Sequence, residues 1–177
     1  MTSHRTASHA LAGIGAALLM VAVLSGCTPE PEPTPTPTAA FASEEEAFAA
    51  AEEVYREYNS AADRSDADTE RFLTGPALDE YLEGAEYLDA NGLTLGGETV
   101  VVSFTGDSVD AAGKVGRVTA TACIDLSKST VINSSGVNVT PPDRAPAWRF
   151  TLTFVGDQSG LLIEKSLGEE DPTCAQA

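Results

Sequence analysis

The stretch from Val115 to Leu126, VGRVTATACIDL, alternates between apolar and polar side chains with unusual regularity. A period of two places successive side chains on opposite faces of a β-strand, so one face should be packed and the other more polar. We expect two faces here: Val118, Ala120, Ala122, Ile124 and Leu126 on the first, and Arg117, Thr119, Thr121, Cys123 and Asp125 on the second.

The same alternation returns in the stretch from Ala147 to Val155, AWRFTLTFV. Two further stretches, 99–105 and 160–167, have the composition of strands, and residues 133–136 have that of a turn. Repeated alternation of this kind predicts an antiparallel sheet whose apolar face is covered by helices. In the second strand we expect Trp148, Phe150, Leu152 and Phe154 to lie opposite Arg149, Thr151 and Thr153.

Helical signals come before the strands. Residues 43–46, SEEE, form a capping box with acidic side chains at the positive end of a helix, and the apolar spacing that follows predicts a helix to about Ala62. A short helical turn is expected over 68–73, and Gly75-Pro76 and Asn91-Gly92 mark the two ends of another helix. The helix between Gly75-Pro76 and Asn91-Gly92 has one apolar face. The sequence therefore predicts an α+β fold with three N-terminal helices packed on a curved antiparallel sheet of four to six strands.

The N-terminus has the three parts of a secretory signal: Arg5 near the start, an apolar run of 15 residues from Ala10 to Leu24, and small residues at a cleavage site. The run is shorter than the ~20 residues of a membrane-spanning helix. Leu24 to Cys27, LSGC, resembles the lipobox of bacterial lipoproteins. That resemblance implies cleavage after Gly26 and a lipid-modified Cys27; the alternative is an ordinary secreted protein.

The residues after Cys27, TPEPEPTPTPT, alternate proline with polar residues. Prolines remove backbone donors and fix a torsion angle, so we expect an extended spacer of about 35 Å rather than a helix or strand. A proline-rich recognition motif is the alternative. The expected organisation is a signal peptide over 1–26, a lipid anchor and linker over 27–40, and one α+β domain over 41–177. The protein would then be held on the extracytoplasmic face of the cell membrane.

Without residues 1–26 the chain has nine Lys and Arg against 27 Asp and Glu, a net charge of −18, and no histidine. This charge disfavours nucleic acid as a partner, because such binding depends on Lys and Arg contacts to phosphate. The lack of histidine excludes a Ser-His-Asp or Cys-His arrangement in the mature chain. We expect no cofactor and no metal site.

Three cysteines remain to be assigned. With Cys27 carrying lipid, Cys123 and Cys174 are expected to form a disulfide, since the compartment outside the membrane permits one. The alternative is a pair of reactive or metal-binding thiols.

The stretch FASEEEAFAAAEEVYREYNSA (residues 41–61), the later CIDLS (123–127), the turn at Gly136 and Cys174 together resemble uncharacterised actinobacterial lipoproteins related to nuclear-transport-factor-2-like proteins. The resemblance implies a cone in which helices and a bent sheet enclose a pocket. That superfamily includes ketosteroid isomerase-like enzymes, dehydratases and non-catalytic binding modules, so the fold alone does not select a function.

Two functions follow as hypotheses. The first is a non-catalytic module that binds a small ligand or another envelope protein, with Tyr55, Tyr58, Trp148 and Asp125 as candidate ligand-binding residues. The second is a small isomerase or dehydratase acting on an exported metabolite, which needs a carboxylate base facing a tyrosine. Asp125 is explained more simply as a solvated carboxylate whose charge Arg117 or Arg149 offsets. We assign no catalytic residue, because no motif of the superfamily aligns with this sequence. In a third case Trp148 and its neighbouring phenylalanines fill the pocket, and the protein acts through its surface.

The lipid anchor can be tested by the substitution Cys27→Ala. This variant should lose membrane attachment, because the lipid chains that hold the protein are joined to that sulfur. The measurement is sedimentation with membranes, and a Cys27→Ala protein that still sediments would exclude the lipoprotein interpretation.

Overall fold

The computed structural model describes residues 39–176. The expected signal peptide, the lipidated Cys27 and the spacer up to Thr38 lie outside the described residues. Within 39–176, no helix has both the length and the apolar character needed to cross a membrane.

Helix α1 (Glu44–Asp63) begins at the expected cap. The Ser43 hydroxyl accepts a hydrogen bond from the Glu46 backbone amide at 3.2 Å, and the Glu46 carboxylate accepts one from the Ala42 amide at 3.2 Å. The first bond satisfies an amide that a helix leaves without a partner in its first turn, and the second fixes the chain just before the cap. The helix buries a stripe of small and aromatic side chains, namely Ala47, Ala51, Tyr55 and Ala61.

Two further helical segments follow, η1 (Thr69–Phe72) and α2 (Gly75–Ala90). As predicted, α2 has proline in its first turn, and it ends at Asn91, before Gly92 with a φ of 61°. The prediction of three helices is wrong in number, because the fold has two α-helices in its described part and η1 is a single 3₁₀ turn of four residues. Such a turn is too short to cover a sheet by itself.

The strands form two antiparallel sheets rather than one. The larger has the order β2-β3-β5-β6 and the smaller pairs β1 with β4. The strands are β1 (Leu93–Gly96), β2 (Val100–Asp110), β3 (Gly116–Asp125), β4 (Thr130–Asn133), β5 (Ala147–Asp157) and β6 (Gly160–Glu170). The short helix η2 (Pro172–Gln176) closes the described chain.

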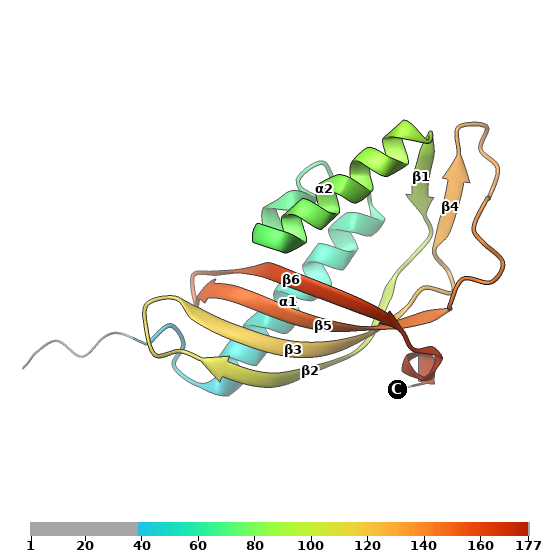
Figure 1. Ribbon diagram of the computed structural model, residues 1–177. Helices are drawn as coiled ribbons and strands as arrows, with labels where there is room; N and C mark the ends of the chain where they lie inside the picture. Colours follow the sequence, from blue (N-terminus) through green and yellow to red (C-terminus); the bar gives the residue numbers. More distant parts are fainter. Residues whose placement is uncertain (1–38, 177) are drawn as a thin grey trace, which may run out of the picture. The chain divides into compact units, whose positions relative to one another are not determined.

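The register confirms the two faces expected for β3 and β5. Ile124 lies opposite Trp148, Ala120 opposite Leu152 and Val118 opposite Phe154, so these side chains share one face. Helix α1 covers that face, while α2 packs beside the edge strand β6 and continues toward β1 (Figure 1). The core lies between α1 and the large sheet, and its largest fully buried side chains come from β3, β5 and β6: Val118, Ile124, Leu152, Phe154 and Ile163.

The core begins at Ala40. This residue and Phe41 are buried, and the Ala40 carbonyl accepts a hydrogen bond from the Gln158 amide at 3.2 Å. The elements described above all belong to one compact unit with its own core, sheet and disulfide. A unit of this kind satisfies the requirements for independent folding.

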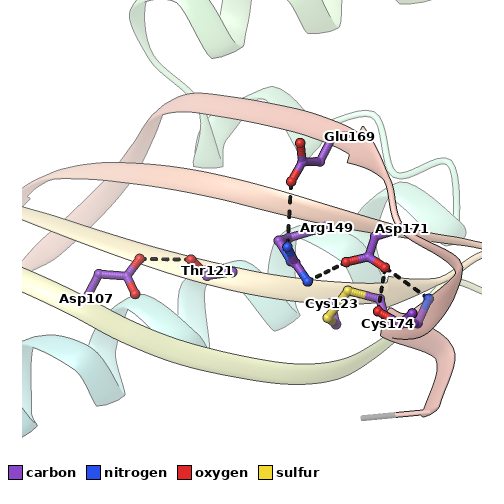
Figure 2. A network of polar contacts seen from close by, with 8 residues as sticks. Asp107, Thr121, Cys123, Arg149, Glu169, Asp171 and Cys174 are labelled. Atoms are coloured by element: carbon purple, nitrogen blue, oxygen red, sulfur yellow. Dashed lines mark hydrogen bonds and ion pairs between the residues drawn. A yellow bond between two sulfur atoms is a disulfide. The ribbon is translucent and has the colours of Figure 1, made fainter.

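The disulfide between Cys123 and Cys174 is present, as expected, with the two Cα atoms 5.1 Å apart. It joins β3 to η2 on the face of the large sheet away from the helices. Figure 2 shows the ion pairs beside it, in which Arg149 contacts Asp171 and, at 3.7 Å, Glu169. A hydrogen bond from the Thr173 hydroxyl lowers the pKa of Asp171. These contacts hold the C-terminal turn against the sheet.

Removal of the disulfide by the double substitution Cys123→Ala and Cys174→Ala should lower the free energy of unfolding by about 4 kcal/mol, because the bond closes a long loop in the unfolded chain. Urea denaturation of the domain measures the difference. The intact mass of the wild-type domain provides the control, since it should be two hydrogens lighter than the reduced form. Free thiols at both positions in the native protein would contradict the disulfide.

Gly106 permits the close approach of α1 to the sheet, because a Cβ atom at this position of β2 would overlap the Phe48 ring. Gly106→Ala should therefore cost about 1–3 kcal/mol of stability through overpacking. Gly160→Ala is the matched control, since its Cβ would meet nothing within 4 Å. Thermal unfolding compares the two variants, and equal midpoints would show that α1 is free to move away from β2.

Candidate functional site

A cavity of about 650 Å³ lies between the C-terminal end of α1, the second half of α2 and strand β1. We call it the α2–β1 groove. Its volume is in the range of sites that hold small organic ligands, about 300–1,000 Å³. It is open along one side.

The walls of the groove are mainly apolar. Tyr81 and Tyr87 of α2 lie on one wall, and Tyr87 is 63% exposed. Leu95 of β1 lies on another wall and is 57% exposed. The remaining apolar side chains of the lining are Ala62, Ala67, Ala85, Leu88 and Leu93. Large apolar side chains that stay exposed in one concave place are typical of binding sites.

The groove exists because α2 is poorly covered by the rest of the domain. Its predicted apolar face consists of Leu78, Tyr81, Leu82, Ala85 and Leu88, yet the one residue of α2 that is buried is Ala77 in its first turn. Leu82 is 46% exposed. The first half of the helix packs against β6, and the second half extends beyond the large sheet toward the separate β1–β4 pair (Figure 1).

Gly84 lies in the middle of α2 and lines the groove. Glycine in a helix interior costs about 1 kcal/mol relative to alanine. Packing does not explain it, because a Cβ atom at Gly84 would meet nothing within 4 Å. The missing side chain leaves additional space in the groove.

Three carboxylates, those of Asp66, Glu80 and Asp89, line the groove, and no lysine or arginine does so. Asp66 is partly compensated, because it accepts a hydrogen bond from the Asp68 amide at 3.1 Å and lies 3.9 Å from Arg64. Glu80 and Asp89 have no ion-pair partner within residues 39–176. The lining is therefore apolar with a negative border.

A second, smaller cavity of about 190 Å³ lies on the other side of Glu80 and Tyr81, against β5 and β6. Tyr58 of α1 contributes to it and stacks on Tyr55, with ring centroids 6.3 Å apart. Burial, the neighbouring Tyr81 and the charge of Glu80 raise the pKa of Tyr58 to about 12. Tyr58 is consequently a neutral hydrogen-bond donor at physiological pH.

The four predicted ligand-binding residues do not converge. Tyr55 is 2% exposed and belongs to the core, and burial raises the pKa of its phenol. Tyr58 lines the small cavity. Trp148 stacks on Phe150 with ring centroids 6.2 Å apart, and Asp125 lies at the end of β3. Neither Trp148 nor Asp125 lines the groove or the small cavity.

Asp125 has a local structural role. Its carboxylate accepts a hydrogen bond from the Ser127 amide at 2.7 Å, and that bond lowers its pKa. The indole nitrogen of Trp148 is buried and has no hydrogen-bond partner among the described residues. Within residues 39–176, no group of three or more His, Cys, Asp or Glu side chains is arranged to hold a metal ion.

Sequence reasoning assigned Tyr81, Ala85 and Leu88 to the apolar face of α2 but did not predict that they form a groove. Gly84 was the available signal, because it interrupts a helix of otherwise strong helix formers. Tyr87 and Leu95 gave no signal, since their exposure depends on how far α2 and β1 extend from the sheet.

No family model matches this chain, and no curated protein matches it in sequence. Among solved structures, the intermembrane space region of the chloroplast protein ARC6 matches with 16% sequence identity and a TM-score of 0.48, over 70% of this chain and 97% of that one. What this domain does must therefore be inferred from its own residues.

Proposed function

We propose that this protein is a lipid-anchored module of the cell envelope that binds a small, largely apolar ligand in the α2–β1 groove, without catalysing a reaction. The observation that carries the proposal is the groove itself: a concave apolar site of about 650 Å³ with exposed Tyr87 and Leu95 on its walls. Such side chains are stabilised when a ligand removes them from water.

The lining of the groove supports binding rather than catalysis. It contains no cysteine, lysine or histidine, and within residues 39–176 none of its hydroxyls is hydrogen-bonded to one of its carboxylates, as an activated nucleophile would be. Gly84 supports the same conclusion, because it keeps part of the groove empty at a cost in helix stability. A ligand that fills this space would account for the glycine.

The proposed location follows from the LSGC sequence at Cys27 and the proline-rich spacer after it. A diacylated cysteine supplies two lipid chains, and two chains give stable attachment where one is marginal. The groove would then be held outside the cytoplasmic membrane, within reach of lipids and exported metabolites.

We propose that the fold of this domain is related to the cone of nuclear-transport-factor-2-like proteins. The support is an α1 helix that covers one face of a four-stranded antiparallel sheet, with α2 beside it. In such a fold the space between the helices and the strands is the natural position for a ligand.

A second candidate is an isomerase or dehydratase centred on the small cavity. The lining of this cavity contains the carboxylate of Glu80 and the phenols of Tyr58 and Tyr81. The charge of Glu80 contributes to the raised pKa of Tyr58. A carboxylate base with a neutral phenol donor is the arrangement that such isomerases need. The cavity of about 190 Å³ is below the ~300 Å³ of most ligand sites, so we rank this function second.

The binding function is tested by filling the groove with Gly84→Trp in the domain 36–177. The uncharged dye Nile red should bind the wild-type domain with saturation, and Gly84→Trp should weaken its binding at least about tenfold, because the indole occupies the space above Gly84. Fluorescence titration measures both affinities.

Gly84→Ala is the matched control. It adds one methyl group, should leave dye binding within about twofold, and should raise stability by up to about 1 kcal/mol because alanine favours the helix. Dye binding that fails to saturate, or that is equal in the wild type and Gly84→Trp, would exclude the groove as a ligand site.

A further inference from the structure

We propose a second binding site, separate from the α2–β1 groove, that holds a small zwitterion such as a free amino acid between Asp63 and Arg144. The site is a cavity of about 240 Å³ between the end of α1, strand β1 and the loops on either side of β4. We call it the Asp63–Arg144 cavity. It shares Ala62 and Leu95 with the groove, but none of the charged or aromatic side chains of the groove.

Two side chains of opposite charge line this cavity, and no other charged residue does so. Asp63 and Arg144 do not form an ion pair with each other, and neither pairs with another charged side chain within residues 39–176. Opposite charges that share a cavity without pairing leave a position for a ligand that carries both charges. Its carboxylate would bind Arg144, and its ammonium group would bind Asp63.

Arg144 is the exception among the arginines of the described chain. The others each lie within 4.0 Å of a carboxylate, namely Arg56, Arg64, Arg71, Arg117 and Arg149. Arg144 is left without one in a chain of 27 acidic and ten basic side chains. This difference distinguishes the cavity from the rest of the acidic surface.

The Arg144 guanidinium is half-buried and fixed in position. It donates to the Ser129 hydroxyl at 3.0 Å and to the carbonyls of Leu126 and Ser129 at 2.7 and 2.8 Å. These bonds use only part of its N–H donors and leave its charge without an anion. A bound carboxylate would supply the anion and accept from the remaining donors.

Asp63 is fixed in a corresponding way on the other side of the ligand position. One oxygen of its carboxylate accepts a hydrogen bond from the Thr99 amide at 2.9 Å, and the other has no hydrogen-bond partner within residues 39–176. Because backbone groups hold both side chains, the two charges are in place before a ligand arrives. Such preorganisation lowers the entropy cost of binding.

The size and the walls of the cavity indicate which zwitterion fits. A volume of about 240 Å³ is several times the ~30 Å³ of one water molecule in the liquid, but it is below the ~300 Å³ of most sites for larger organic ligands. Leu95 and Leu126 supply apolar side chains to the lining. These features favour an amino acid with an aliphatic side chain over a peptide or a lipid.

The test compares L-leucine with two analogues that each lack one charge, by isothermal titration calorimetry on the domain 36–177. Leucinamide keeps the ammonium group but has no carboxylate, and N-acetylleucine keeps the carboxylate but has no ammonium group. Leucine should bind with saturation, and each analogue at least about tenfold more weakly, because one of the two charge-assisted contacts is lost.

Substitutions assign each charge of the ligand to one side chain. Asp63→Asn should weaken leucine about tenfold without weakening N-acetylleucine, and Arg144→Gln should weaken leucine equally without weakening leucinamide. The matched controls are Asp143→Asn and Arg64→Gln, because both residues are exposed, lie outside the cavity lining and remove the same charges. Both controls should bind leucine as the wild type does.

Selective loss of leucine binding in these variants supports the site. The inference is overturned if leucine gives no saturable binding up to about 10 mM, or if leucine and both analogues bind equally. Asp63→Asn with the two analogues decides the question by itself where Arg144→Gln does not fold. Gly84→Trp should leave leucine binding unchanged, because Gly84 lines the groove and not this cavity, so failure of the groove is a separate result.

Discussion

The close contact between α1 and the large sheet is the constraint on which the rest of the domain depends. Small side chains make it possible on both sides, because Ala47 and Ala51 of α1 and Ala120 and Ala122 of β3 are all fully buried. Phe48 then lies directly over Gly106 of β2. A helix seated this deeply covers most of the apolar face of the sheet, so only the first half of α2 packs there, against β6, and its second half can extend beyond the sheet.

The main sheet could be predicted from the sequence because its signal is local. The alternation in β3 and β5 assigns each side chain to a face, and the register confirms the assignment, with Ile124 opposite Trp148. The caps of α1 and α2 are also local, since they depend on Ser43 and on Asn91-Gly92. The four strands of the large sheet correspond to the four predicted stretches, but the second sheet, in which β1 pairs with β4, was not predicted. The separation of β1 and β4 depends on long-range pairing, which periodicity does not encode.

The groove could not be predicted in the same way. The apolar stripe of α2 indicated a buried face, but amphipathic spacing does not say whether the partner of that face is the sheet or a ligand. Tyr55 and Tyr58 lie on the deeply seated helix, so they became core and near-core residues rather than groove residues. Gly84 carried the missing information, because its cost to the helix has no compensation in packing within the described residues.

The acidic composition of the chain does not by itself locate a binding site. A charge of −17 over the whole chain is first explained by solubility, which requires no particular position for any carboxylate. Glu80 and Asp89 border the groove, but most carboxylates within residues 39–176 also lack an ion-pair partner, so the absence of a partner does not distinguish these two. Both side chains are exposed to water and salt, which screen their charges. What distinguishes the groove is therefore its exposed apolar lining, with Tyr87 and Leu95, rather than its charge.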